Sequence, residues 1–214
     1  MSNSRIDFIF DLETIGANVH ACPIVDMAYA TFEYERFTDD PYTFEHLVKS
    51  VVKTLKPSIS EQMTNYNCSY KRSDVEWWKS LPDHAKNKIK PLPTDLTMNQ
   101  FYDSINQYLN DQKKIDYWWS RGNTFDPVIL WRLMDEKQKA LFDNKLKFYK
   151  VRDIRTHIDA KFNYDTVSNF IPVSDTDYWY STFVAHDSTH DVAADILRLQ
   201  AIYRAENDLP QMER

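Results

Sequence analysis

The chain has 214 residues, a formal net charge of −6 at pH 7 and 27% charged residues, as expected for one ordinary soluble domain. The acidic balance argues against a general basic footprint for nucleic acid, although an enzyme that holds metal ions brings its own positive charge to a phosphate. Two cysteines, Cys22 and Cys68, cannot make a disulfide framework, and no secretory signal or membrane-spanning apolar run is present. We therefore expect a single domain over residues 1–214 that works in a reducing cytoplasm without a membrane partner.

The N-terminal quarter of the chain predicts three strands. Residues 5–14 alternate apolar and other side chains and end in acids, residues 23–34 form a second apolar run, and residues 42–49 form a third. The connections between them are short, which favours antiparallel pairing in a meander.

The first predicted strand ends in two acids that could form a metal site. Asp11 and Glu13 are two residues apart, so on a strand they project from the same face. Adjacent carboxylates repel each other unless a positive group lies between them, and hard oxygen ligands suit magnesium or manganese. The alternative is an exposed strand end where both acids are solvated. Gly16 follows closely and allows the backbone to turn or to approach a ligand.

Residues 56–92 predict an insertion made of loop and short helices. Its first part is polar and irregular, and helices are expected over residues 73–80 and 82–90. The tandem Trp77 and Trp78 allow two interpretations: one ring in the core and one at a groove, or both rings buried.

The remainder of the chain alternates helices and strands. Strands are expected over 115–120 and 148–154, and helices over 97–110, 127–133 and 155–162. Residues 164–182 are polar and aromatic and predict a surface loop. Together with the meander, these elements predict an α/β domain in which a mixed sheet is flanked by helices.

A last helix is predicted after residue 187, because apolar residues recur at helical spacing from Val192 to Tyr203 and Asp187 and Ser188 are good N-cap residues. Asp191 then lies near the start of this helix, and His186 lies in the preceding loop. Taken alone, the acid could simply interact with the helix dipole, and the histidine could be a surface group.

Asp126 lies at a strand-to-helix junction, a position where sites tend to lie in α/β folds, although it could equally be the N-cap of the following helix. Acids from three distant segments could therefore meet at one end of the sheet.

Three motifs of this chain resemble those of the DEDDh 3′-to-5′ exonucleases: Asp11-Leu12-Glu13-Thr14, Phe125-Asp126, and His186 with Asp191 five positions later. Their order and spacing agree with that family. Within it, the chain most resembles the phage exodeoxyribonuclease A group, on four further segments: Glu76-Trp77-Trp78-Lys79, Arg121-Gly122 before Thr124-Phe125-Asp126, Arg152-Asp153-Ile154-Arg155-Thr156, and Phe183-Val184-Ala185-His186-Asp187-Ser188. The family often has an asparagine four residues before the acid of its second motif, where this sequence has Gly122. The resemblance implies a ribonuclease H-like fold.

The resemblance also implies an activity, which is hydrolysis of DNA to 5′-nucleoside monophosphates from the 3′ end of single strands, in the host cytoplasm if a phage encodes the chain. It assigns two Mg²⁺ or Mn²⁺ ions to the acids and the general base to His186; the acids are Asp11, Glu13, Asp126 and Asp191. By the same analogy, contacts to the terminal nucleotide fall to Leu12, Thr14, Ile15 and Phe125, although Phe125 could equally be a core residue. The alternatives are a 3′-to-5′ exoribonuclease or oligoribonuclease, and a non-catalytic nucleic-acid-binding module.

Overall fold

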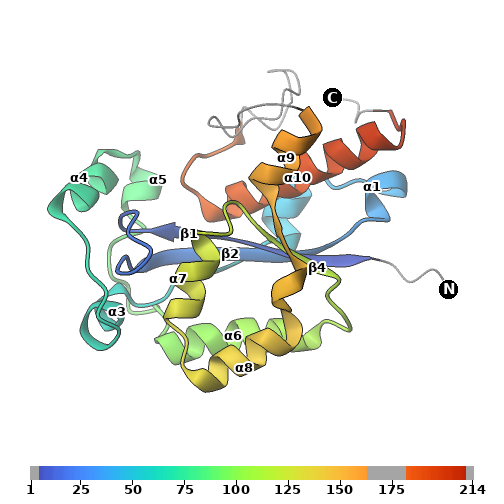
Figure 1. Cartoon of the computed structure of the whole chain (residues 1–214). Helices are drawn as coiled ribbons and strands as arrows, with labels where there is room; N and C mark the ends of the chain where they lie inside the picture. The colour runs from blue at the N-terminus through green and yellow to red at the C-terminus, as the bar shows by residue number, and fades with distance from the viewer. Residues whose placement is uncertain (1–4, 163–181, 211–214) are drawn as a thin grey trace.

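A five-stranded mixed sheet forms the centre of the computed structural model, which describes residues 5–162 and 182–210 (Figure 1). The strand order is β3-β2-β1-β4-β5, with bounds β1 (Ile6–Thr14), β2 (Ile24–Glu33), β3 (Lys53–Leu55), β4 (Tyr117–Ser120) and β5 (Val151–Asp153). The pairs β1–β2 and β2–β3 are antiparallel, whereas β1–β4 and β4–β5 are parallel. The predicted α/β class and mixed sheet are confirmed. The loop predicted over 164–182 falls almost wholly outside the described residues.

Helices cover both faces of the sheet, and the alternation of β1 decides which residues each face receives. Phe8, Phe10 and Leu12 point into a core shared with α6 (Met98–Asp111), α7 (Asp126–Arg132) and α8 (Glu136–Lys145). Ile9 points to the opposite face, where it packs in a second core with α9 (Ile154–Phe162) and α10 (Ser188–Glu206). Since side chains alternate along a strand, Asp11 and Glu13 lie on the same face as α10.

The third strand was predicted at residues 42–49, and this prediction is wrong. The segment is helical: Thr43 Oγ1 accepts a hydrogen bond from His46 N at 3.2 Å and begins α2 (Phe44–His46), which continues as a π-helical turn over Leu47–Val51. Phe44 and Leu47 are both buried, and their three-residue spacing fits one side of a helix. The meander nevertheless exists, because β3 follows at Lys53–Leu55.

Smaller differences affect the helices. The helix predicted over 82–90 shortens to α5 (Asp83–Lys86), and residues 36–39 form a short helix α1 (Arg36–Asp39). Before β5, Phe148–Lys150 forms a 3₁₀ turn where the sequence predicted strand. Helix α8 was not predicted, because only Gln138 and Phe142 of it are buried and no apolar stripe marks it in the sequence.

The insertion lies beyond the end of β1 and comprises α3 (Ile59–Asn65), α4 (Arg72–Ser80) and α5 (Figure 1). Of the tandem tryptophans, Trp78 is fully buried in a small core with Ile15 and Ala85, while Trp77 is 46% exposed. The indole Nε1 of Trp78 donates a hydrogen bond to the carbonyl oxygen of Thr14 at 3.0 Å, which ties α4 directly to the end of β1.

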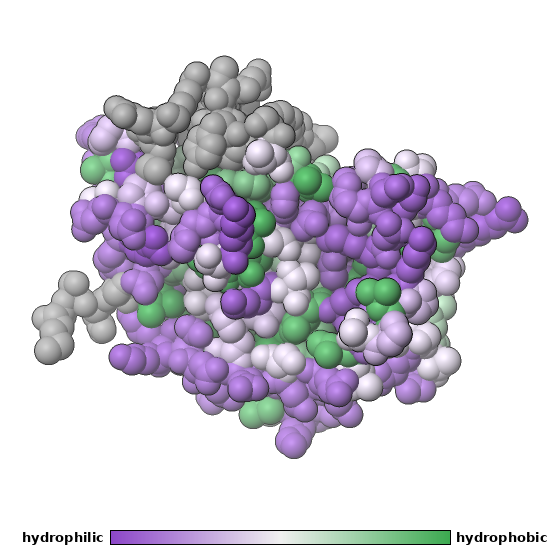
Figure 2. Space-filling model, turned by 180° about the vertical axis from the view of Figure 1, so that it is seen from behind, coloured by the Kyte–Doolittle hydropathy of each residue, from purple (hydrophilic) through white to green (hydrophobic). Residues whose placement is uncertain are grey.

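The molecular surface is consistent with this layered core. On the face seen in Figure 2, hydrophilic residues predominate and hydrophobic residues form small separate patches. No helix in the two described ranges is long and apolar enough to cross a bilayer.

Candidate active site and metal centre

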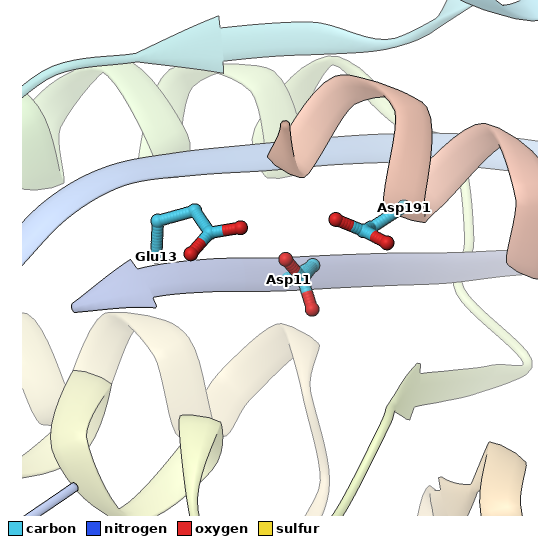
Figure 3. Close-up of side chains that lie close together, drawn as sticks. All are labelled: Asp11, Glu13 and Asp191. Atoms are coloured by element: carbon cyan, nitrogen blue, oxygen red, sulfur yellow. The ribbon is translucent and has the colours of Figure 1, made fainter. Parts of the chain in front are cut away.

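Three carboxylates meet between β1 and the start of α10. Asp11 and Glu13 project from β1, and Asp191 projects toward them from the first turn of α10 (Figure 3). One oxygen from each of the three lies within 4.8 Å of the others. Such a set of hard oxygen donors fits a divalent cation such as Mg²⁺ or Mn²⁺.

The start of α10 is fixed by its own sequence, so the position of Asp191 is determined as well. Asp187 is the N-cap, and its Oδ1 accepts hydrogen bonds from the backbone N–H groups of Thr189 at 3.1 Å and His190 at 3.4 Å. Behind this cap, Val192 and Ile196 are fully buried against the sheet. The packed face holds the helix in place while its first turn presents Asp191 to β1.

Asp126 lies beside this group but not within it. It is the first residue of α7, is only 3% exposed, and interacts electrostatically with Asp11 and Asp191. Phe125 occupies the N-cap position, so the alternative of Asp126 as the helix cap does not describe the structure. Asp126 is therefore a buried acid close enough to the other carboxylates to interact with their charges.

The carboxylates raise one another's proton affinity. Burial, followed by repulsion from neighbouring acids, raises the pKa of Asp11 and of Asp126 well above the usual range. Burial and the charge of Asp191 raise the pKa of Glu13 to about 8, and burial and the charge of Asp195 raise that of Asp191 to about 7. Buried acids in this arrangement need protons or cations, and a bound divalent ion would remove the repulsion.

One buried ion-pair network adjoins the acids and was not predicted. Asp195, one turn after Asp191, accepts hydrogen bonds from the guanidinium groups of Arg121 and Arg198. Burial opposes ionisation of Asp195, yet the two guanidinium groups hold its pKa below the usual range. Arg121 also interacts with Asp11 and Asp191, so it supplies positive charge to the site. The signal in the sequence was a set of charges inside an apolar helix, where charges are rarely buried unless paired.

His186 stands apart from the three carboxylates. It lies in the turn before α10 with φ at 60°, and its ring meets the ring of Trp77 edge to face at a centroid distance of 5.0 Å. Burial, followed by the charges of His84 and Lys88, lowers its pKa from the usual 6.5. The imidazole is therefore neutral at pH 7 and able to accept a proton. His190, in contrast, packs on Phe44, and its Nδ1 accepts a hydrogen bond from the N–H of Val184 at 2.9 Å.

The four residues assigned to the terminal nucleotide lie near the acids along the chain, but two of them face inward. Leu12 is 6% exposed and Ile15 is 2% exposed, each in a different core. Phe125 is half-buried against the core, and the Thr14 hydroxyl donates a hydrogen bond to the Gly16 carbonyl at 2.8 Å. Their role at a nucleotide stays a prediction.

The raised pKa values lead to an expected pH dependence in the metal-free protein. A carboxyl whose pKa is higher in the folded state binds a proton that the unfolded state has released, so stability falls as pH rises from about 4 to about 8. In chelator, we expect the Tm to fall across this window, by about 2–4 °C for each kcal/mol lost. Millimolar Mn²⁺ should raise the Tm more at pH 8 than at pH 5, because protons compete with the metal.

A thermal shift series with Glu13→Gln and with Asp103→Asn as a matched control checks this expectation, since Asp103 is exposed on α6. Glu13→Gln should flatten the slope and Asp103→Asn should not. A metal-free Tm that rises steadily from pH 5 to pH 8 would contradict the account.

The chain is similar to known proteins over most of its length. The family model of the 3′-5′ exoribonuclease Rv2179c-like domain matches residues 7–193. A protein named exodeoxyribonuclease from Enterobacteria phage T4 is 32% identical over 213 residues, which covers 92% of this chain and 89% of the relative.

Solved structures show the same fold at low identity. Exonuclease I of E. coli, in a zinc-bound complex with single-stranded DNA, superposes with a TM-score of 0.56 at 12% identity, over 96% of this chain and 42% of that chain. A moderately thermophilic exonuclease I from Methylocaldum szegediense gives 0.56 at 14% identity, over 95% and 41%. The chain thus spans about two fifths of the length of these two proteins, which share its ribonuclease H-like fold. On the family match over most of its length, the chain belongs to the 3′-5′ exoribonuclease Rv2179c-like family and is a 3′-5′ exonuclease.

Proposed function

We propose that the protein hydrolyses single-stranded DNA from its 3′ end and releases 5′-nucleoside monophosphates. The observation that carries this proposal is the meeting of Asp11, Glu13 and Asp191, with one oxygen of each inside 4.8 Å, next to the buried Asp126. The choice of DNA is supported by the phage T4 relative, named an exodeoxyribonuclease, and by exonuclease I structures in complex with DNA oligonucleotides.

The metal requirement of the proposal rests on the same four acids. Asp11, Glu13, Asp126 and Asp191 would hold two divalent ions, Mg²⁺ or Mn²⁺. When bound, such ions polarise a phosphoryl oxygen and lower the pKa of water. The raised pKa values of Glu13, about 8, and Asp191, about 7, support this assignment, because carboxyls in such surroundings gain from a nearby cation.

In the proposed reaction, His186 is the general base that takes the proton from the attacking water. A neutral imidazole suits this task at pH 7, and the lowered pKa of His186 keeps it neutral. Glu13 and Thr14 would meet the terminal 3′ hydroxyl, and Phe125 would contact the last base. Because Leu12 and Ile15 are buried, their contact with that base requires local repacking at the end of β1.

The alternative substrate is RNA, which the description of the matching family favours. The two sugars differ by the 2′-OH, so discrimination depends on groups around the terminal ribose. The test measures initial rates on matched DNA and RNA oligonucleotides and on DNA that ends in one ribonucleotide. We expect the all-DNA strand to be degraded fastest. Faster degradation of RNA would overturn the choice of substrate, and binding of both strands without turnover would indicate a non-catalytic binding module.

We further infer that residues 1–214 form one exonuclease domain in which 56–92 is an insertion, and that the protein works in the cytoplasm, that of the host if a phage encodes it. The two buried cysteines, Cys22 and Cys68, are free, which suits a reducing compartment.

A further inference from the structure

The loop that carries His186 is tied to the insertion by a shared lysine. Lys88, which follows α5, lies with its Nζ 2.8 Å from Asp26 Oδ2 and 3.4 Å from Asp187 Oδ2. Asp187 directly follows His186 and caps α10. The Lys88 side chain is 16% exposed, so these ion pairs are largely withdrawn from water and are screened less than pairs on the surface.

The same lysine is connected to the strand beside the carboxylates. Asp26 is a buried residue of β2 that pairs with Glu13 in the β1–β2 register. Its Oδ1 accepts a hydrogen bond from Ser188 Oγ at 2.7 Å, and Ser188 is the first residue of α10. A network of four side chains therefore joins the insertion, the sheet and the helix start around the loop of His186.

Trp77 supplies a second contact from the insertion. Its ring meets that of His186 edge to face at 5.0 Å, and on α4 it is supported by the buried Trp78, with ring centroids 5.5 Å apart. Trp78 is in turn hydrogen-bonded to the Thr14 carbonyl. A Cβ on Gly16 would lie 2.7 Å from Asp74 Oδ2, so the start of α4 packs closely on the turn after β1. Trp77 therefore lies on a helix that is tied to the strand bearing Asp11.

The backbone at His186 needs such support. Its φ of 60° lies in the left-handed region, which is strained for a residue other than glycine and persists only where the surroundings enforce it. The Lys88–Asp187 ion pair holds the residue that follows His186 in the chain, and the Trp77 ring contacts the His186 imidazole itself. Strain of this kind is found where a side chain must be aimed in a fixed direction.

We propose that Lys88 and Trp77 are positioning residues that hold the imidazole of His186 in the orientation required to accept a proton from the attacking water. This inference rests on the proposed function, because it takes His186 as the general base. It gives the insertion a role in the reaction, because both positioning residues belong to it.

The kinetic test compares Lys88→Met and Trp77→Ala with the conservative Lys88→Arg and Trp77→Phe. We expect the first two to lower kcat by about tenfold or more with KM changed less than about twofold, since displacing a catalytic group by 1 Å can cost about 10²-fold. The conservative pair should recover most of the rate. Exposed residues provide matched controls, Lys79→Met on α4 and Tyr149→Ala before β5, and neither should change kcat.

A double-mutant cycle separates positioning from other roles. In a His186→Ala background, Trp77→Ala should lower kcat no further, because it acts through the missing imidazole. Lys88→Met should lower kcat far less than in the wild-type background, the remainder coming from the interaction of Lys88 with Glu13. An equal effect in both backgrounds would overturn the proposal. In particular, a rise in KM on Trp77→Ala that persists without His186 would identify Trp77 as a stacking platform for a base instead.

An NMR measurement tests the positioning role independently of nuclease activity. The proton signal of the His186 imidazole, assigned by its loss in His186→Ala, should move in Trp77→Ala, which removes the ring current, and broaden in Lys88→Met, which frees the loop. If both variants have the Tm of the wild type and their His186 signals are unchanged, the positioning role is overturned. If instead the wild-type protein degrades no nucleic acid while the signals change as expected, the proposed function fails, but the conclusion that Lys88 and Trp77 hold the His186 imidazole in place remains.

Discussion

Asp191→Asn is expected to lower kcat/KM for 3′-to-5′ hydrolysis by about 10³-fold or more, because charge stabilisation by bound metal ions is worth several kcal/mol and each 1.36 kcal/mol is tenfold in rate. Asparagine keeps the shape of the side chain but removes the carboxylate that meets Asp11 and Glu13 from α10. The loss should appear in assays with Mg²⁺ and with Mn²⁺.

The same variant should fold at least as well as the wild type in chelator at pH 8. Its removed carboxyl has a pKa of about 7, so at pH 8 it is an ionised, buried and repelled group in the metal-free protein. A Tm equal to or above that of the wild type, together with the lost activity, separates a chemical role from a folding defect. Asp103→Asn, at an exposed position of α6, is the matched control for activity. Activity of Asp191→Asn within a factor of ten of the wild type would contradict the assignment.

His186→Ala is expected to lower kcat by about 10²–10⁴-fold, the usual contribution of a general base. Because His186 lies outside the group of three carboxylates, the concentration of Mn²⁺ that gives half-maximal stabilisation should change little. Steady-state kinetics and metal titrations followed by Tm measure the two effects separately.

The pH dependence of kcat tests whether His186 acts in its unprotonated form, as a base. The wild-type kcat should rise as His186 loses its proton, at a pH below 6.5, and be level near pH 7, since burial lowers the pKa of this imidazole. That rise should disappear in His186→Ala and persist in His46→Ala, a control at an exposed position of α2. An identical rise in His186→Ala would show that another group is the base.

Local sequence patterns predicted much of the frame around these residues. The alternation of β1 predicted that Asp11 and Glu13 share a face, and the cap at Asp187 predicted where the last helix begins; the structure has both features. These features depend on neighbours within a few residues, so periodicity and capping rules suffice for them. The same reliance on local patterns explains why the predicted third strand was wrong. A short apolar run fits a helix as well as a strand.

Contacts between distant segments could not be predicted in this way. The pairing of Lys88 with Asp26 and Asp187, the contact of Trp77 with His186, and the contact of Arg121 with Asp195 each depend on the tertiary fold. Composition marks such residues only weakly, as an acid within an apolar strand for Asp26 or as charges within an apolar helix for Asp195. The sequence therefore indicated that Asp11, Glu13 and Asp191 could meet, but not which distant side chains contact them and His186.

The most direct measurement follows a 5′-labelled single-stranded DNA oligonucleotide with the wild-type protein, in Mg²⁺, in Mn²⁺ and in chelator, and identifies the released nucleotide. The account predicts a ladder that shortens from the 3′ end only when metal is present, with 5′-nucleoside monophosphates as product, and no ladder with Asp191→Asn. A ladder of equal rate in chelator, or internal cuts in place of stepwise shortening, would contradict it.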